Sequence, residues 1–301
     1  MAGDQIVRAR GGVEVLEEAS FKEDPDHARR RILVALGGHR SPIEAVDFGR
    51  RIAETIQGTL HGLLVWPWSI SPRDVPRLLE IDPDALRGMV IEVAVGDVAD
   101  RIAESSRAGS VAFLVLPVDS DGPDPCGLGC LAARALREAG SSVIVVRPGH
   151  PSRRLARILV PLDGTPSTAA AVAPAGELAR LAGASLDLVM VGQIDLPTMV
   201  PIELGTMVTP QYVDQPQHEW PAFSQEFLAR FLGAIGRCPR GVPARFCLRA
   251  GDPAREILRA AKDLDSDLIA LVWHGGCEGD HGRVFRRVLR DAGLPVLVLR
   301  G

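Results

Sequence analysis

The residues best suited to bind a ligand lie near the end of the chain, in a glycine-rich loop at 274–283. This loop follows six consecutive apolar residues, 268–273, and Arg283 stands where the next predicted helix begins. A glycine loop between a buried strand and a helix presents backbone N–H groups and the positive end of the helix dipole to an anion. The stretch therefore predicts an anion site. Its glycines are Gly275, Gly276, Gly279 and Gly282.

The same loop is dense in residue types that bind metal ions. His274, Cys277 and His281 could surround a Zn²⁺ ion if the loop curled tightly. A polar surface loop built on a glycine-rich turn accounts for the same residues without a metal. The metal hypothesis therefore stands beside the anion hypothesis as an alternative.

The elements that position this loop belong to a repeat with a period near 150 residues. Four blocks recur in the same order, which indicates two duplicated domains and not a solenoid. The matching blocks are 31–38 with 157–164, 96–102 with 251–257, 129–140 with 282–293, and 143–147 with 296–300.

Each copy has the pattern β-α-β-α-β-α-β-α-β. Its first strand, at 32–36 or 158–162, is continuously apolar, as expected for a strand covered on both faces. Asp97 and Asp252 are natural N-caps for the helices that follow them. Alternating strands and helices favour a parallel sheet with right-handed crossovers. The predicted fold class is therefore α/β, with two domains that each contain a five-stranded parallel sheet between helices. The other predicted helices include 42–56, 168–182 and one after Arg283.

The predicted domains are 31–150 and 151–301, preceded by a polar, loosely ordered arm at 1–30. The second copy carries about 29 extra residues between its second and third strands. They comprise a loop at 193–220 and a predicted helix at 223–236. A loop of this length is usually a lid or an interaction surface, and otherwise a simple excursion.

Three motifs resemble the universal stress protein family in its tandem, two-domain form. They lie at 158–167, 251–258 and 282–300, and the resemblance covers nearly everything after residue 30, most clearly in the second copy. It implies Rossmann-like domains of the adenine-nucleotide α-hydrolase-like type, some of which bind ATP. It also implies that the two copies pair through their last strands, 143–147 and 296–300.

The family's ATP-binding pattern can be matched to the second copy only in part. Val272 replaces the first glycine of the phosphate loop, the loop is three residues short, and Arg283 occupies a Ser/Thr position. Arg283 could clamp a phosphate or fill the space that phosphates need. Asp163 could equally be an ordinary turn residue. The residues that the resemblance implies for nucleotide binding are Asp163, Gly164, Thr165, Val191 (or Met190), Gly275, Gly276, Gly282 and Arg283.

The first copy departs further from the pattern. Gly37 replaces the aspartate, Pro117 and Ser120 replace the early glycines, and Cys130 stands in the Ser/Thr position. Three acidic residues within 119–125 would repel phosphate. We therefore expect this copy to bind no ATP and to provide the pairing surface for the second.

Composition limits the function classes. The 301 residues carry a net charge of −4, so no overall basic balance indicates nucleic acid as a partner. The apolar runs are of strand length, the N-terminus lacks a signal-peptide pattern, and five cysteines fit reduced thiols, so we expect a cytoplasmic protein away from membranes.

Catalytic triads and paired carboxylates are not evident, so we expect no enzyme beyond slow nucleotide hydrolysis. The favoured hypothesis is a regulatory module that binds ATP or another adenine nucleotide in the second copy. The alternatives are a scaffold that binds a protein through 193–220, and a metal- or redox-responsive protein using 274–281. Two chains could also associate as a homodimer.

Overall fold

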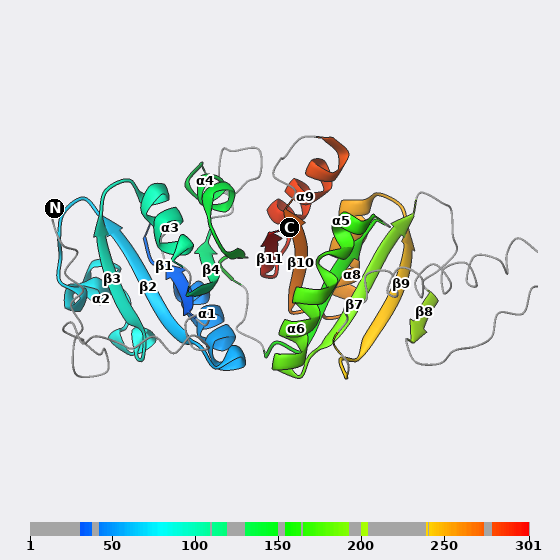
Figure 1. Ribbon diagram of the computed structural model, residues 1–301, viewed down its shortest axis with the longest axis horizontal. Helices are drawn as coiled ribbons and strands as arrows, with labels where there is room; N and C mark the ends of the chain where they lie inside the picture. The colour runs from blue at the N-terminus through cyan, green and yellow to red at the C-terminus, as the bar shows by residue number, and fades with distance from the viewer. Residues whose placement is uncertain are drawn as a thin grey trace, which may run out of the picture. The chain divides into compact units, whose positions relative to one another are not determined.

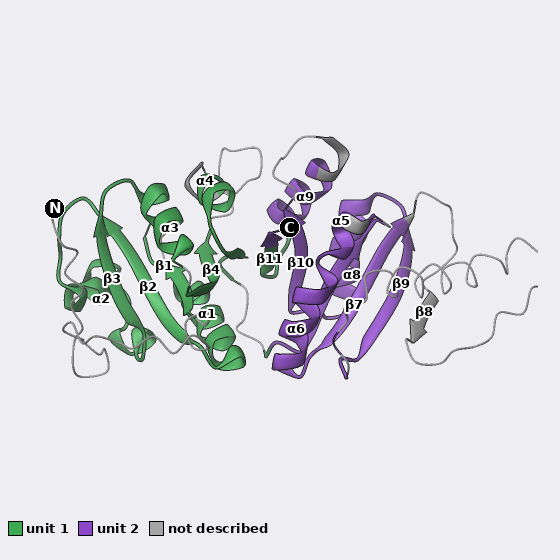
Figure 2. Ribbon diagram, in the orientation of Figure 1, with its two compact units in different colours: residues 1–154, 292–298 green, residues 155–291, 299–301 purple. Residues whose placement is uncertain are grey.

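The computed structural model describes ten stretches of the chain, which divide into two compact units (Figure 2). Unit 1 comprises Met1–Arg154 and Ala292–Val298, and unit 2 comprises Leu155–Asp291 and Leu299–Gly301. The predictions for the arm at 1–30, most of 193–220 and the helix at 223–236 fall outside the described residues. The described residues are 31–37, 42–108, 110–118, 130–149, 154–163, 165–192, 200–203, 239, 241–273 and 279–300.

Unit 1 contains the predicted five-stranded parallel sheet, in the order β3-β2-β1-β4-β5 (Figure 1). Its central strand β1 is apolar, and Ile32, Leu33 and Val34 are fully buried. Burial of such a strand on both faces is the reason for its unbroken apolar sequence. The strands are β1 (Arg31–Ala35), β2 (Thr59–Trp66), β3 (Val90–Val95), β4 (Val111–Pro117) and β5 (Ser142–Val146).

The first three residues of the last strand, β11 (Val296–Arg300), belong to unit 1. This strand runs antiparallel to β5, and its register joins Val296 to Val145, Leu297 to Ile144 and Val298 to Val143. The predicted pairing of the segments at 143–147 and 296–300 is therefore present.

The helices of unit 1 include three that occupy predicted positions. Between β2 and β3, where the repeat pattern predicts one helix, the chain forms three short helices. The helices are α1 (Ile43–Ile56), α3 (Val98–Arg107) and α4 (Cys130–Glu138), with η1 (Pro72–Asp74), α2 (Val75–Leu78) and η2 (Pro83–Leu86) between β2 and β3.

Unit 2 repeats the parallel arrangement, in the order β10-β6-β7-β9, and adds β8 antiparallel to β9. The short strand β8 lies within the predicted loop at 193–220, and its Val200 is paired with Leu248 of β9. Part of this loop therefore extends the sheet beyond β9. The strands are β6 (Arg157–Leu162), β7 (Ser185–Gly192), β8 (Val200–Glu203), β9 (Ala244–Ala250) and β10 (Leu268–Trp273).

Two predicted helices of unit 2 have different bounds from those expected. The segment at 168–182 is not one helix but two, α5 (Pro166–Ala169) and α6 (Val172–Ala182). Pro174 explains the break, because a proline lacks the N–H that a helix interior requires and is tolerated in a first turn. The last helix, α9 (Gly279–Asp291), begins within the predicted loop and not after Arg283. The remaining helix is α8 (Pro253–Asp263).

Both units cap the helix after their third parallel strand in the same way. The side chain of Asp97 accepts a hydrogen bond from the backbone N–H of Asp100 at 3.0 Å, and that of Asp252 accepts one from Arg255 at 2.9 Å. Each cap satisfies a backbone donor that has no partner within the helix. The predicted N-caps are confirmed.

No helix within the described ranges has the combined length and apolar character needed to cross a membrane.

Candidate functional site

The candidate site of unit 2 lies where β6, β7 and β10 end. Leu162, the last residue of β6, is paired with Met190 of β7, so Asp163 and Val191 follow side by side in sequence register. On its other side β6 is paired with β10, through Ile158 and Leu268. The next strand in the sequence, β7, therefore lies on one side of β6, and the later strand β10 lies on the other side. The order of the strands in the sheet reverses at β6. Open parallel sheets bind ligands at the carboxyl ends of strands around such a reversal.

Asp163 is exposed and organises the turn after β6. Its Oδ1 atom accepts hydrogen bonds from the backbone N–H of Thr165 at 2.8 Å and from its hydroxyl at 2.7 Å. The hydroxyl of Thr168 donates a hydrogen bond to the same oxygen at 2.6 Å. This hydroxyl also accepts a hydrogen bond from the backbone N–H of Asp163 at 3.2 Å. Asp163 is therefore a turn-forming residue, as one of the two interpretations expected. The turn also holds the carboxylate in a defined orientation at the end of β6.

Val191 lies near the end of β7 and is half-buried, as is Met190 before it. An apolar side chain at this position could contact the face of a planar ring. Thr165 is also half-buried, and Gly164 lies outside the described residues.

An aromatic pair closes the end of β10. The indole of Trp273 and the ring of Phe285 in α9 have centroids 5.1 Å apart at an interplanar angle of 55°. Both residues are less than a tenth exposed, so they fix the position of α9 against the carboxyl end of β10. Sequence reasoning treated Trp273 only as part of the strand. A large aromatic residue at the last strand position was the available signal for this contact.

The predicted phosphate loop is only partly described. Gly275 and Gly276 lie outside the described residues, whereas Gly282 and Arg283 are the fourth and fifth residues of α9. Backbone N–H groups from the fifth helical position onward are engaged within a helix, so Arg283 can offer an anion only its side chain. That side chain is exposed at the surface of α9.

The metal alternative gains no support. His274 and Cys277, like the side chain of His281, lie outside the described residues. Among the residues that the structure does describe, no group of three or more His, Cys, Asp or Glu side chains could hold a metal ion.

The equivalent end of unit 1 has no carboxylate after β1. A Cβ atom added to Gly37 would lie 3.2 Å from Cδ1 of Leu64, so an aspartate there would crowd β2. At the end of β2 the rings of Trp66 and Trp68 form an edge-to-face pair, with centroids 5.9 Å apart at 83°. In unit 1 the residue equivalent to Val191 is Val65, and the aromatic pair follows it directly. The acidic linker at 119–125 lies outside the described residues.

Comparison with known proteins identifies one family and one fold. Residues 155–300 match the model of the universal stress protein family. A protein of unknown function from Pseudomonas aeruginosa PAO1 has a similar structure, with a TM-score of 0.62 and 18% identity over 92% of this chain and 95% of the other.

Two further structures share the fold over most of both chains. A universal stress protein from Archaeoglobus fulgidus has a TM-score of 0.58 and 14% identity, covering 91% of this chain and 97% of the other. A candidate universal stress protein from Pseudomonas aeruginosa UCBPP-PA14 has a TM-score of 0.58 and 18% identity, covering 92% of this chain and 95% of the other. At sequence identities this low, the structural similarity establishes the α/β fold and not a shared function.

Proposed function

Because residues 155–300 belong to the universal stress protein family, we propose that this chain is a stress-response binding protein that holds an adenine nucleotide in unit 2. The observation that carries the proposal is the position of Asp163. It places an oriented carboxylate directly after β6, between β7 and β10, where sheets of this class receive their ligands. Unit 1 has Gly37 at the same position, so the proposed site is confined to unit 2.

The turn around Asp163 suits it to a binding role. A carboxylate has roughly four acceptor positions, and ribose hydroxyls and the adenine amino group are donors of the matching kind. Thr165 and Thr168 already fix the Asp163 side chain. Little side-chain entropy is then lost when a ligand binds, which favours affinity. Val191 supplies the apolar contact for the base.

The phosphate side of the site is shorter than in the family's ATP-binding pattern. The loop after β10 has three residues fewer, and α9 begins at Gly279. Gly275 and Gly276 remain the residues proposed to approach phosphate, together with backbone N–H groups at the start of α9. Arg283, one turn further on, could pair with a phosphate oxygen through its exposed guanidinium. This arrangement favours binding over chemical turnover.

The test is nucleotide binding by the purified full chain. We expect AMP, ADP or ATP to raise the melting temperature, since a ligand at 100 times its dissociation constant stabilises by about 2.7 kcal/mol. Asp163→Asn keeps an acceptor for the turn and removes the charge, so it should fold normally and weaken binding at least tenfold. Asp252→Asn, which changes the cap of α8, is the matched control and should bind as the natural protein does.

No stabilisation by any adenine nucleotide at millimolar concentration would contradict the proposal. So would equal affinity in the natural protein and Asp163→Asn. Mass spectrometry of small molecules released from the purified protein by acid provides an independent measurement of any nucleotide that co-purifies.

A further inference from the structure

The α8–α9 face of unit 2 carries a cluster of exposed cations, of which only Arg283 is also assigned to the proposed nucleotide site. On α8 they recur at spacings of four and three residues, which places them on one side of the helix. The two helices are neighbours, because Arg287 of α9 contacts Asp252 at the start of α8 at 2.9 Å. We call this cluster the basic face. Its residues are Arg255, Arg259, Lys262, Arg283 and Arg290.

Unit 1 provides an internal comparison, since the repeat gives each of these positions an equivalent. The unit 1 residues include two acids, two cations and one neutral residue, so their charges cancel, whereas all five in unit 2 are positive. Because α3 and α4 pack in unit 1 without such a cluster, the fold does not require it. The equivalents, in order, are Asp100, Glu104, Arg107, Cys130 and Arg137.

The three cations on α8 and the apolar side chain of Leu258 line a hollow at the surface. This hollow of about 540 Å³ is lined by Arg255, Leu258, Arg259 and Lys262. Within the described part of the chain, neither Arg255 nor Lys262 forms an ion pair, whereas Arg259 lies 3.6 Å from Glu256. The hollow therefore suits a segment with several carboxylates and a few apolar side chains.

One stretch of this chain has that composition. Residues 13–26 contain six carboxylates and a single cation, Lys22, interspersed with apolar residues such as Leu16 and Phe21. Their charge is opposite to that of the basic face, in which Arg290 is already paired with Asp291 at 2.8 Å. Such complementarity steers association and selects the partner. The acidic residues are Glu14, Glu17, Glu18, Glu23, Asp24 and Asp26.

We propose that the basic face docks the acidic segment at 13–26 of a second copy of the chain. Reciprocal exchange then forms two identical contacts related by a two-fold axis, the commonest symmetry of protein dimers. The contact depends on the carboxylates of one copy and the cations of the other, so it weakens as salt screens the charges.

The lysine content of the chain permits a direct test. Lys22 and Lys262 are its only lysines, and Lys262 lies on the basic face. A zero-length carbodiimide joins a lysine amine to a carboxylate that it contacts. A mixture of unlabelled and ¹⁵N-labelled full chains should yield peptides that join Lys262 of one chain to an acidic residue at 13–26 of the other. These hybrid peptides should disappear at about 0.5 M salt.

The matched variant replaces Arg255→Asp and Arg259→Glu, the residues that unit 1 carries at these positions, and leaves Lys262 as the reporter. We expect it to lose the hybrid peptides and to raise the dissociation constant of the dimer at least tenfold in sedimentation. The control Arg137→Glu, on α4 of unit 1, should change neither. Links confined to single chains, or hybrid links unchanged in the double variant, would overturn the proposal. An unchanged melting temperature shows that loss of binding is not loss of folding.

Discussion

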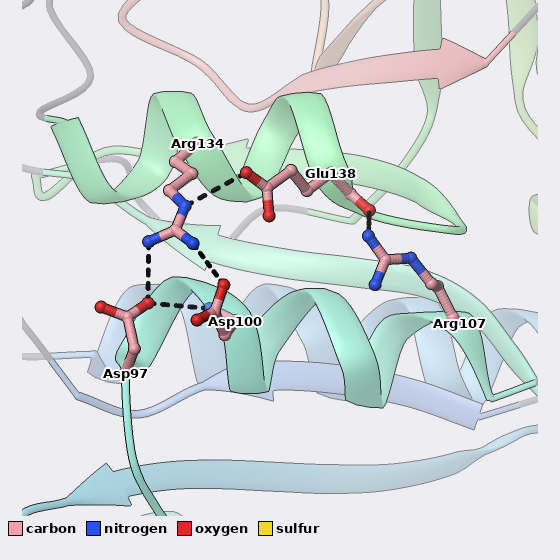
Figure 3. A network of polar contacts seen from close by, with 5 residues as sticks. All are labelled: Asp97, Asp100, Arg107, Arg134 and Glu138. Carbon is pink, nitrogen blue, oxygen red and sulfur yellow. Dashed lines mark hydrogen bonds and ion pairs between the residues drawn. The ribbon is translucent and has the colours of Figure 1, made fainter.

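Arg134 of α4 lies 2.9 Å from the capping carboxylate of Asp97 at the start of α3 (Figure 3). It also contacts Asp100, and its Nε lies 3.1 Å from Glu138 one turn along α4. Unit 2 repeats the central pair, because Arg287 lies 2.9 Å from Asp252. In both units, therefore, one aspartate caps a helix and joins it to the next helix.

Removal of this cap should destabilise unit 1. Asp97→Ala is expected to lower the free energy of unfolding by about 1–2 kcal/mol, because the N–H of Asp100 loses its acceptor. Asp97→Asn keeps a capping oxygen and loses only an exposed ion pair, which should cost less than about 1 kcal/mol. Urea unfolding measured by circular dichroism tests both. Equal stability of the two variants would mean that the ion pair, and not the cap, is the main contribution of Asp97 to the free energy of unfolding. Asp252→Ala in unit 2 should behave as Asp97→Ala does.

The ion pair between buried Asp187 of β7 and half-buried Arg245 of β9 should be costly to break from one side. Asp187 is fully buried, and its Oδ1 lies 2.8 Å from Nε of Arg245 on the neighbouring strand. Arg245→Met is expected to lower the free energy of unfolding by about 2–3 kcal/mol, because the buried carboxylate loses its cation. Adding Asp187→Leu should recover most of that loss. A double-mutant cycle in urea measures the coupling.

The exposed pair of Arg180 and Glu177, 2.5 Å apart on α6, is the control for this cycle. Arg180→Met should cost less than about 1 kcal/mol, since water screens the charges. A double variant at Asp187 and Arg245 that was as unstable as Arg245→Met alone would contradict the expected recovery.

Sequence reasoning predicted the elements whose signals are local. The strand β1 is continuously apolar, and Asp97 and Asp252 stand directly before their helices. It missed β8, because a four-residue strand containing Pro201 has weak propensity and forms through pairing with β9. It also placed the start of α9 too late. Gly279 and Asp280 are typical loop residues, and nothing local indicates that the helix includes them.

The candidate site was predictable in its position but not in its geometry. Asp163 could be placed after β6 from the repeat, whereas its contacts with Thr165 and Thr168 depend on the path of the turn. The contact between the tilted rings of Trp273 and Phe285 joins residues from a strand and the following helix. Their side-chain directions follow only from the packed structure.

The turn after β6 should depend on the acceptor oxygen of residue 163. Asp163→Ala removes the acceptor for the N–H of Thr165 and is expected to lower the free energy of unfolding by about 1–2 kcal/mol without ligand. Asp163→Asn should change it by less than about 0.5 kcal/mol, because the amide oxygen can accept the same bond. Thermal unfolding of the ligand-free protein compares the two. Equal destabilisation would show that the charge, and not the acceptor, stabilises the turn.

Glu92 should make unit 1 sensitive to acid. Burial acts to raise its pKa, but a hydrogen bond with His61 and the charges of Arg31 and His61 outweigh burial and lower the pKa below its ordinary value. Arg31 lies 2.5 Å from Glu92, and His61 lies 3.1 Å from it. A carboxylate with a lowered folded pKa stabilises above its unfolded pKa, and this stability is lost as pH falls through the folded value.

The natural protein should therefore exceed Glu92→Gln in stability at pH 7, by about 1–2 kcal/mol. The difference should shrink as the pH falls below about 4.5. Urea unfolding at pH 7, 5, 4 and 3 measures it. Glu104→Gln, which removes a largely exposed carboxylate, is the control and should show little difference at any pH. A difference for Glu92→Gln that stayed constant down to pH 3 would contradict the linkage.

Cys247 should be protected from thiol reagents in the folded protein. It is 1% exposed on β9, where it is paired with Val189 on one side and Pro201 of β8 on the other. Burial raises the pKa of its thiol, as does the charge of Asp187, so little reactive thiolate forms near neutral pH. Iodoacetamide at pH 7.5 should leave Cys247 unmodified in the native chain and label it fully in guanidinium, as measured by peptide mass spectrometry. Rapid native labelling would mean that the packing around β9 opens readily, since the buried thiol must become exposed to react.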